Sequence, residues 1–218
     1  MKKLLIIFFI GTIISILIYN ITRYKKTDIL IIGDSIATGD TIYGNSGINF
    51  NLYLKDYLKD KNLGNYDLTY TKNNLTIKDF NYQFTENNEI NDKHIQNRIS
   101  ESEIIIIALG QDELISKSMI NRLKYNDRKE FYKNYEQLLI NLRNVSKKDI
   151  FIIGLYSDKI NQLNEIENNI ISISQKYNVN YIKINNVISK NDLFDKNSHL
   201  NYNGHKKIFE LLKEQIRL

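Results

Sequence analysis

The stretch DILIIGDSIATGD, residues 28–40, decides the fold class. It opens with an unbroken apolar run that ends in Gly33, and the polar residues Asp34 and Ser35 follow at once. Apolar runs without alternation are typical of strands that are buried on both faces of a parallel sheet. Gly-Asp is typical of a turn, so we expect Ser35 to lie directly beyond the carboxyl end of a buried strand.

Similar runs recur along the chain and alternate with helical patterns. Further strands are predicted at residues 103–110, 149–156 and 179–184, with a weaker one at 67–71. Apolar stripes of helical period fall at residues 49–61, 131–145, 163–177 and 208–212. This alternation predicts an α/β fold with an open, mostly parallel five-stranded sheet, helices on both faces, and a ligand site beyond the carboxyl ends of the strands.

Length and composition limit the alternatives. The 218 residues suit one sizeable domain, which we place at residues 28–218. The chain has no cysteine, which excludes disulfides and thiolate metal sites. Of its 30 basic side chains, five lie in residues 1–27, which contain no acid, so the remainder has 25 basic and 25 acidic side chains. That neutral remainder argues against a nucleic-acid partner.

The amino-terminal segment has the composition of a membrane-spanning helix. Residues 4–21 carry no charge and are just long enough to span a bilayer as a helix. A secretory signal peptide is the rival interpretation, but no small-x-small cleavage site follows the apolar run. We therefore predict an uncleaved, single-pass anchor in residues 1–27. The basic flanks are nearly balanced, so the positive-inside rule does not decide which way it points.

Ser35 is the first candidate for chemistry, although taken alone a turn or helix N-cap explains this serine better than a nucleophile does. A serine nucleophile needs a base, and the chain has three histidines. His94 lies in a polar segment that we expect to be helical and exposed. His199 lies in a loop ahead of the last helix, where it would face the carboxyl edge of the sheet. His205 opens that helix, and we expect it to pack or face solvent.

Three blocks in chain order resemble the SGNH, or GDSL-type, hydrolases. They are GDSIATG at 33–39, ALGQDEL at 108–114 and SHLNYNGHKKI at 198–208. The resemblance covers residues 28–218 and implies a flavodoxin-like, three-layer sandwich outside the cytoplasm. It implies that Ser35 attacks an ester carbonyl, that its own backbone N–H helps to hold the oxyanion, and that His199 is the general base.

The third block departs from the family pattern. Where the family has Gly-x-Asn-Asp, this chain has Gly110, Gln111, Asp112 and Glu113. Asp112 replaces an amide that would donate to the oxyanion, and an ionised carboxylate has no proton to donate. Losing one such donor costs about 2.7–4 kcal/mol. Three outcomes stay open: Asp112 is protonated, Gln111 donates instead, or the activity is weak or absent.

Two further positions also depart from it. The acid that orients the histidine should lie three residues before it, but that residue is Lys196. We take Asp195 as the orienting acid, with a backbone carbonyl as the alternative. The glycine of the second block is missing. The stretch YTKNNLTIKDF at 70–80 occupies its place, so the backbone N–H of Asn74 is the expected contributor to the oxyanion hole.

The sequence contains no glycine-rich phosphate loop, and we expect no cofactor and no metal. A Mg²⁺ site built from Asp34, Asp112 and Glu113 is a weaker alternative. The resemblance implies acetyl or short acyl esters of carbohydrate, or lipid esters, as substrates. We therefore predict a membrane-anchored serine esterase that hydrolyses O-acyl esters of surface carbohydrate or of lipid through an acyl-enzyme intermediate. The alternative is a binding module of the same fold with weakened or no activity.

Overall fold

The structure is a computed structural model. It describes residues 27–41, 44–45, 49–91, 93–120, 124–157, 162–194 and 199–216.

A five-stranded parallel sheet forms the centre of the molecule. Its strands are β1 (Thr27–Gly33), β4 (Gly64–Thr71), β7 (Ile104–Ala108), β8 (Asp149–Ile153) and β9 (Asn180–Ile182). They lie in the order β4-β1-β7-β8-β9, and every neighbouring pair is parallel. The five predicted strands are confirmed. Counted along the chain the order is 2-1-3-4-5, the flavodoxin-like arrangement.

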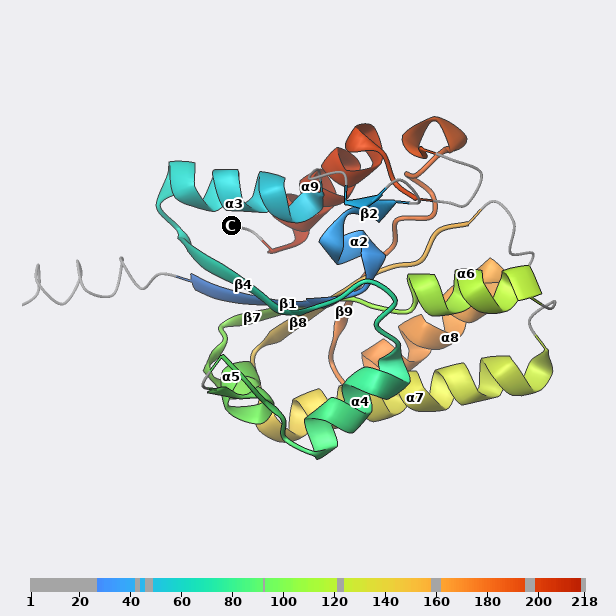
Figure 1. Ribbon diagram of the computed structural model, residues 1–218, viewed down its shortest axis with the longest axis horizontal. Coiled ribbons are helices and arrows are strands. Elements are labelled where there is room, and N and C mark those ends of the chain that lie inside the picture. Colours follow the sequence, from blue (N-terminus) through green and yellow to red (C-terminus); the bar gives the residue numbers. More distant parts are fainter. Residues whose placement is uncertain are drawn as a thin grey trace, which may run out of the picture.

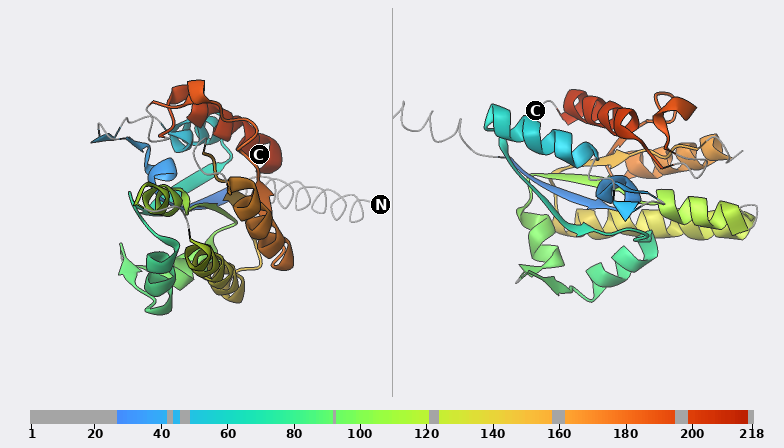
Figure 2. Two further views of the ribbon diagram at one scale, coloured as in Figure 1. Left: turned by 90° about the vertical axis from the view of Figure 1, so that its right-hand side faces the viewer. Right: turned by 45° about the horizontal axis from the view of Figure 1, so that its top comes forward.

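Helices cover both faces of this sheet (Figure 1). One face carries α3 (Phe50–Lys61) and α9 (Tyr202–Ile216). The other carries α4 (Ile77–Thr85), α5 (Ile95–Glu101), α7 (Tyr125–Val145) and α8 (Leu163–Lys176). Two helices follow the carboxyl ends of their strands, α2 (Ser35–Thr38) after β1 and α6 (Gln111–Ile120) after β7. The turned views in Figure 2 show the sheet between the two helix layers.

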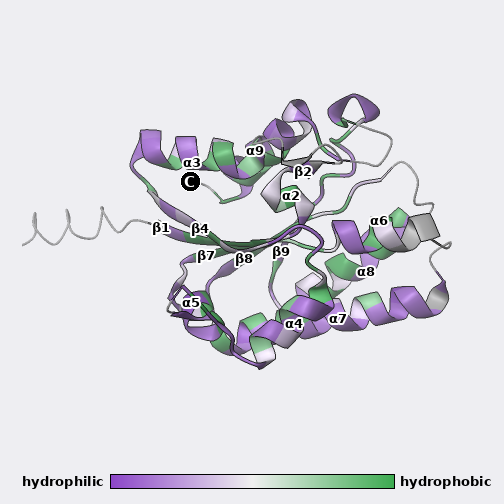
Figure 3. Ribbon diagram, in the orientation of Figure 1, coloured by the Kyte–Doolittle hydropathy of each residue, from purple (hydrophilic) through white to green (hydrophobic). Residues whose placement is uncertain are grey.

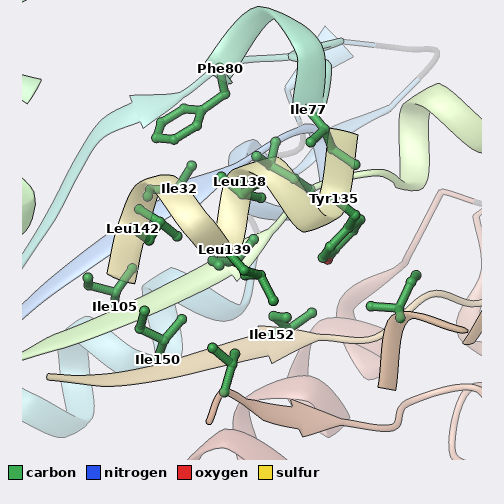
Figure 4. Close-up of a cluster of buried hydrophobic side chains, with 14 of the residues drawn as sticks. Ile32, Ile77, Phe80, Ile105, Tyr135, Leu138, Leu139, Leu142, Ile150 and Ile152 are labelled. Carbon is green, nitrogen blue, oxygen red and sulfur yellow. The ribbon is translucent and has the colours of Figure 1, made fainter. Parts of the chain in front are cut away.

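The core has one apolar cluster on each side of the sheet. In the larger cluster, Leu138, Leu139 and Leu142 of α7 pack near Ile105 and Ile150 of the sheet (Figure 4). Figure 3 shows hydrophobic central strands beneath helices in which hydrophobic and hydrophilic residues alternate. Both faces of the sheet are therefore buried, which explains the unbroken apolar runs in the sequence.

A charged cluster connects β1 and β4 on the side of the sheet away from the carboxyl ends of the strands. The register between β1 and β4 shifts between Leu30 and Ile32, which marks a β-bulge. Arg98 of α5 reaches both strands, donating to Asp28 of β1 at 3.2 Å and to Asp67 of β4. The guanidinium thus joins two strands at the edge opposite to Ser35.

Short elements complete the fold, and one of them corrects a prediction. They are β2 (Asp40–Thr41), β3 (Gly44–Asn45), β5 (Glu89–Ile90), β6 (Lys93–His94) and the 3₁₀ turn η1 (Lys190–Asp192). His94 is exposed as expected, but it lies in the hairpin strand β6 rather than in a helix. The helix starts one residue later, because His94 has extended backbone dihedral angles at the N-cap of α5.

None of the described helices combines the length and the apolar character that crossing a bilayer requires. The predicted anchor, residues 4–21, lies outside the described residues. It stays a prediction.

Candidate active site

The turn after β1 brings Ser35 to the edge of the sheet. Gly33 ends the strand, and a Cβ there would lie 2.4 Å from the Cβ of Ala37 and 3.0 Å from the carbonyl oxygen of Ala108. Only glycine lets α2 and β7 approach the strand this closely. The backbone N–H of Asp34 then donates to Ala108 at 2.9 Å, which ties the turn to the end of β7.

Asp34 joins the two loops that carry the site. Its carboxylate is fully buried and accepts from the backbone N–H of Ile36 at 3.2 Å, Gly110 at 3.0 Å and Asp112 at 3.2 Å. Burial raises the pKa of Asp34 well above its usual value, and the charge of Asp112 raises it further, although the backbone N–H groups oppose both effects. The residue therefore fixes α2 against α6.

These loops meet at the topological switch point of the sheet. The chain runs outward from β1 to β4 on one side and from β7 to β8 and β9 on the other. Ligands of such folds bind in the crevice beyond the carboxyl ends of the strands at this point. Ser35 follows β1 and Asp112 follows β7, so the switch point is where the two side chains meet.

The central observation is that three donors converge on the Asp112 carboxylate. Its Oδ2 accepts from the backbone N–H of Ser35 at 3.0 Å and from that of Asn74 at 3.0 Å. Its Oδ1 accepts the hydroxyl hydrogen of Ser35 in a short hydrogen bond. Asn74 can present its N–H because its backbone is left-handed, with φ at 58°. A single carboxyl oxygen thus lies between two backbone donors.

Two N–H groups at about 3 Å from one oxygen have the geometry of an oxyanion hole. The structure therefore brings together Ser35, Asn74 and Asp112, three residues that the sequence placed in such a hole. Asp112 acts there as an acceptor, however, in the position that an oxyanion would occupy. A carboxylate has only acceptors to offer to these donors.

Gln111 has a different partner. Its Nε2 donates to the carbonyl of Tyr156 at 2.7 Å, and its Oε1 accepts from the Tyr156 N–H at 3.2 Å. Both ends of the amide are engaged with one backbone segment beyond β8. Among the described contacts the amide does not reach Ser35 or Asn74, so the idea that Gln111 replaces the missing donor is not supported by this arrangement.

His199 belongs to an antiparallel pairing in front of α9, the hairpin formed by residues 193–194 with residues 199–200. Leu193 and Leu200 form an isolated antiparallel bridge, and the N–H of Phe194 donates to the carbonyl of His199 at 2.8 Å. Among the described contacts the hydroxyl of Ser35 donates to Asp112 and not to His199. The catalytic pairing of Ser35 with His199 stays a prediction.

Asp192 anchors this hairpin. The carboxylate is 3% exposed and accepts from the N–H and the hydroxyl of Ser189, both at 2.7 Å, and from Nζ of Lys207 at 2.7 Å. Burial alone would raise the pKa of Asp192, but the bonds from Lys207 and Ser189 lower it below its usual value. Asp195, predicted to orient His199, lies outside the described residues.

His205 packs in the interior. It is 2% exposed, and burial lowers its pKa to about 4. Its Nδ1 has no hydrogen-bond partner among the described residues. His205 is thus a buried residue of α9, in agreement with the expectation that it packs.

Solved structures share this architecture. LAE5, an alpha/beta hydrolase enzyme from the metagenome of Lake Arreo, Spain, superposes with a TM-score of 0.66 at 13% identity, over 88% of this chain and 96% of that chain. Axe2, an acetylxylan esterase from Geobacillus stearothermophilus, gives 0.68 at 14% identity, over 88% and 94%. TesA gives 0.65 at 12% identity, over 88% and 98%.

The chain has the SGNH-hydrolase fold. Sequence comparison alone finds no match, either to a protein-family model or to a curated protein. At these low identities the likeness speaks for the fold, and the chemistry has to be argued from the site.

Three supports of this SGNH-fold site were not predicted from the sequence. They are the Asp34 bridge between two loops, the Gln111 clamp on Tyr156, and the anchoring of the hairpin by Asp192. A polar side chain directly after a buried strand was the available signal for Asp34. The other two depend on pairs that are 45 and 15 residues apart, for which the sequence contains no local signal.

The magnesium alternative gains no support. No group of three acidic or histidine side chains among the described residues is arranged to hold a metal ion. Asp34 accepts from backbone N–H groups, Asp112 accepts from backbone N–H groups and from the Ser35 hydroxyl, and Glu113 accepts from the N–H of Ile77 at 3.3 Å.

Proposed function

We propose that this protein is a carboxylic-ester hydrolase in which Ser35 is the nucleophile. The convergence of the Ser35 and Asn74 N–H groups on one oxygen, beside the Ser35 hydroxyl, carries the proposal. Acyl transfer needs this combination of a nucleophile and two donors for the oxygen that becomes negative. The esterase neighbours with the same fold support the reaction class.

The reaction would proceed in two steps, acylation of Ser35 and hydrolysis of the acyl-enzyme. His199 takes the hydroxyl proton as Oγ of Ser35 bonds to the carbonyl carbon, and the carbonyl oxygen becomes an oxyanion. When the tetrahedral intermediate collapses, the bond to the leaving oxygen breaks and His199 returns the proton to the departing alcohol. Water, activated by the same base, then releases the acid from Ser35.

Asp112 opposes this reaction in its observed position. Its Oδ2 occupies the space between the two donors, so a substrate carbonyl has to displace it. A displaced but nearby carboxylate would still repel the developing negative charge. We therefore expect slow turnover in the natural protein. The same contact favours a second candidate function, a binding module of this fold with little or no activity.

The proposed substrate is an O-acyl ester on a surface glycan. If residues 4–21 anchor the chain, the amino end of β1 faces the bilayer and Ser35 lies at the opposite end of this seven-residue strand. At about 3.3 Å per residue the strand separates the two by about 23 Å. A glycan reaches that position more readily than a phospholipid does. Axe2, whose name refers to acetylxylan, supports carbohydrate esters as the class.

Hydrolysis of p-nitrophenyl acetate by the full chain in detergent tests the reaction. The set contains the natural protein, Ser35→Ala, Asp112→Asn and the double variant, each with and without EDTA. Activity that disappears with Ser35→Ala and ignores EDTA supports the esterase. If the natural protein is inactive and Asp112→Asn is active, the result supports the binding module with little or no activity. Activity that survives Ser35→Ala in both backgrounds rejects the proposal.

A further inference from the structure

A hollow of about 260 Å³ lies at the carboxyl ends of β8 and β9. Tyr156 and Ser157, which follow β8, line one side of it, and Asn185, Ile188 and Leu193, which follow β9, line the other. Ser35 follows β1 at the same edge of the sheet, with β7 between. The hollow thus lies along the crevice in which ligands of this architecture bind.

Hydrogen bonds connect the wall of this hollow to the segment that contacts Ser35. Gln111 is the immediate neighbour of Asp112, and its amide is bonded to both the N–H and the carbonyl of Tyr156. Tyr156 is 4% exposed, so the clamp fixes a wall of the hollow rather than a mobile loop. A shift of this wall would therefore change the position of Gln111 and of its neighbour Asp112.

The hollow is tied to the histidine as well. Leu193 lines it and forms the antiparallel bridge with Leu200, the residue after His199. A ligand in the hollow would therefore lie between the segment that carries Asp112 and the segment that carries His199. In an ester hydrolase the leaving alcohol occupies such a position, because it takes its proton from the histidine.

The lining selects a chemical class. Tyr156, Ile188 and Leu193 supply apolar surface, and polar side chains come from Ser157, Asn185, Ser189 and Lys190. A long acyl chain needs a continuous apolar wall, because it leaves polar groups without partners. A sugar ring offers both apolar C–H faces and hydroxyl groups that pair with such side chains. The volume lies below the ~300–1,000 Å³ of sites for drug-sized ligands, which suits a single ring.

We propose that this hollow is the subsite for the alcohol half of the ester and that it holds one sugar ring. The proposal rests on the proposed function, because it assigns the ring to the leaving group of that reaction. Asn185 is one of the lining side chains that favour a sugar over a hydrocarbon, because its amide can pair with hydroxyl groups.

Binding tests the subsite without relying on catalysis. The probe is a mono-O-acetylated methyl glucoside, titrated by NMR or calorimetry into the full chain carrying Ser35→Ala. We expect saturable binding that Asn185→Ala weakens about 3- to 10-fold, the effect of one lost hydrogen bond. Asn186→Ala is the matched control, because Asn186 is the next residue, is exposed and does not line the hollow.

A second variant keeps the test decisive. Asn185 also bonds Glu167, so Asn185→Ala changes one contact outside the hollow. Ser157→Trp fills the hollow from the other side and should abolish binding while the protein still melts cooperatively. No binding to Ser35→Ala, or equal affinity in Asn185→Ala and Asn186→Ala, overturns the proposal.

Kinetics separate this proposal from the proposed function. In the Asp112→Asn background, Asn185→Ala should raise KM for the acetylated glucoside at least threefold more than KM for p-nitrophenyl acetate, because that ester has no sugar. If p-nitrophenyl acetate is hydrolysed but the glucoside neither binds nor reacts, the subsite is wrong and the esterase stands. If the glucoside binds but no ester is hydrolysed, the subsite stands as a binding site and the esterase fails.

Discussion

Oδ2 of Asp112 lies 3.0 Å from the backbone nitrogen of Ser35, while Oδ1 of the same carboxylate accepts the Ser35 hydroxyl hydrogen. One side chain thus engages both the hydroxyl and the backbone N–H of Ser35. In the proposed reaction, a carboxylate in that position takes the space that the oxyanion would need. If the proposed reaction is right, the rate of this protein should therefore depend strongly on Asp112.

Replacing Asp112 with Asn should increase esterase activity. The change removes the charge and supplies an amide that can donate to the oxyanion, while the backbone N–H of residue 112 keeps its bond to Asp34. One oxyanion donor is worth about 10²–10³ in kcat. We expect a gain of about 10² in kcat/KM for p-nitrophenyl acetate, measured beside Ser35→Ala/Asp112→Asn as a blank. A loss of activity in Asp112→Asn would instead make Asp112 a participant in the reaction.

Asn74 should matter through its backbone. Its side chain is exposed, its φ is 58°, and its N–H lies 3.0 Å from Oδ2 of Asp112. In the Asp112→Asn background, Asn74→Gly should keep the activity, because glycine adopts this conformation readily. Asn74→Val should lose activity and about 1–2 kcal/mol of stability, because a branched side chain disfavours left-handed backbone.

The neighbouring residue supplies the control for this pair. Asn73 is exposed as well but is not among the described residues with positive φ. Asn73→Val should therefore leave both the melting temperature and the activity close to the parent. Equal losses in Asn73→Val and Asn74→Val would point to a general sensitivity of the loop and not to the Asn74 N–H.

The stability of the fold should fall in mild acid because of His205. Burial lowers its pKa to about 4 from about 6.5 in the unfolded chain. The unfolded state therefore binds the proton more tightly, so stability is complete above about pH 6.5 and is lost as the pH falls toward 4. Between pH 7 and 5 this linkage amounts to about 2 kcal/mol.

Urea unfolding at the two pH values measures this effect. His205→Leu removes the titrating group, so its free energy of unfolding should change less between pH 7 and pH 5 than that of the parent protein. The difference between the two changes isolates His205 from all other acids and histidines. Identical changes in both proteins would mean that His205 is protonated without disturbing the fold.

Arg98→Met should destabilise the protein without altering the site. The guanidinium is 16% exposed and bonds Asp28 and Asp67, which would be left without their shared cation. Hydrogen bonds between charged groups contribute about 1.5–3 kcal/mol, and we expect a loss of about 2 kcal/mol in chemical denaturation. Lys93→Met, which removes an ion pair that is half exposed on both sides, should leave the denaturation midpoint unchanged.

The sheet could be predicted because its evidence is local. A strand buried on both faces needs a continuous apolar run, and residues 29–33 or 103–110 show such a run without reference to the rest of the chain. The position of Ser35 follows in the same way, since it comes directly after the first run. His94 was assigned to a helix because its segment is polar, and the two-residue strand that it occupies is too short to leave a pattern.

The contacts of the site could not be predicted in the same way. The sequence shows that Asp112 replaces an amide, but not that its carboxylate lies between the N–H groups of Ser35 and Asn74. Likewise the amide of Gln111 was available for the oxyanion until the structure showed it bonded to Tyr156. Each of these pairings spans between 38 and 77 residues, and no local pattern records it.

By itself the sequence determined the α/β class, the five strands and the residue types that meet at the carboxyl edge of the sheet, because periodicity and chain order are one-dimensional properties. The tertiary structure alone decided that Asp112 fills the space between two backbone donors and that Asp34 joins the two loops that carry them. These hydrogen bonds join loops that are distant in the sequence. The relative position of such loops is set by the packing of the whole sheet and its helices.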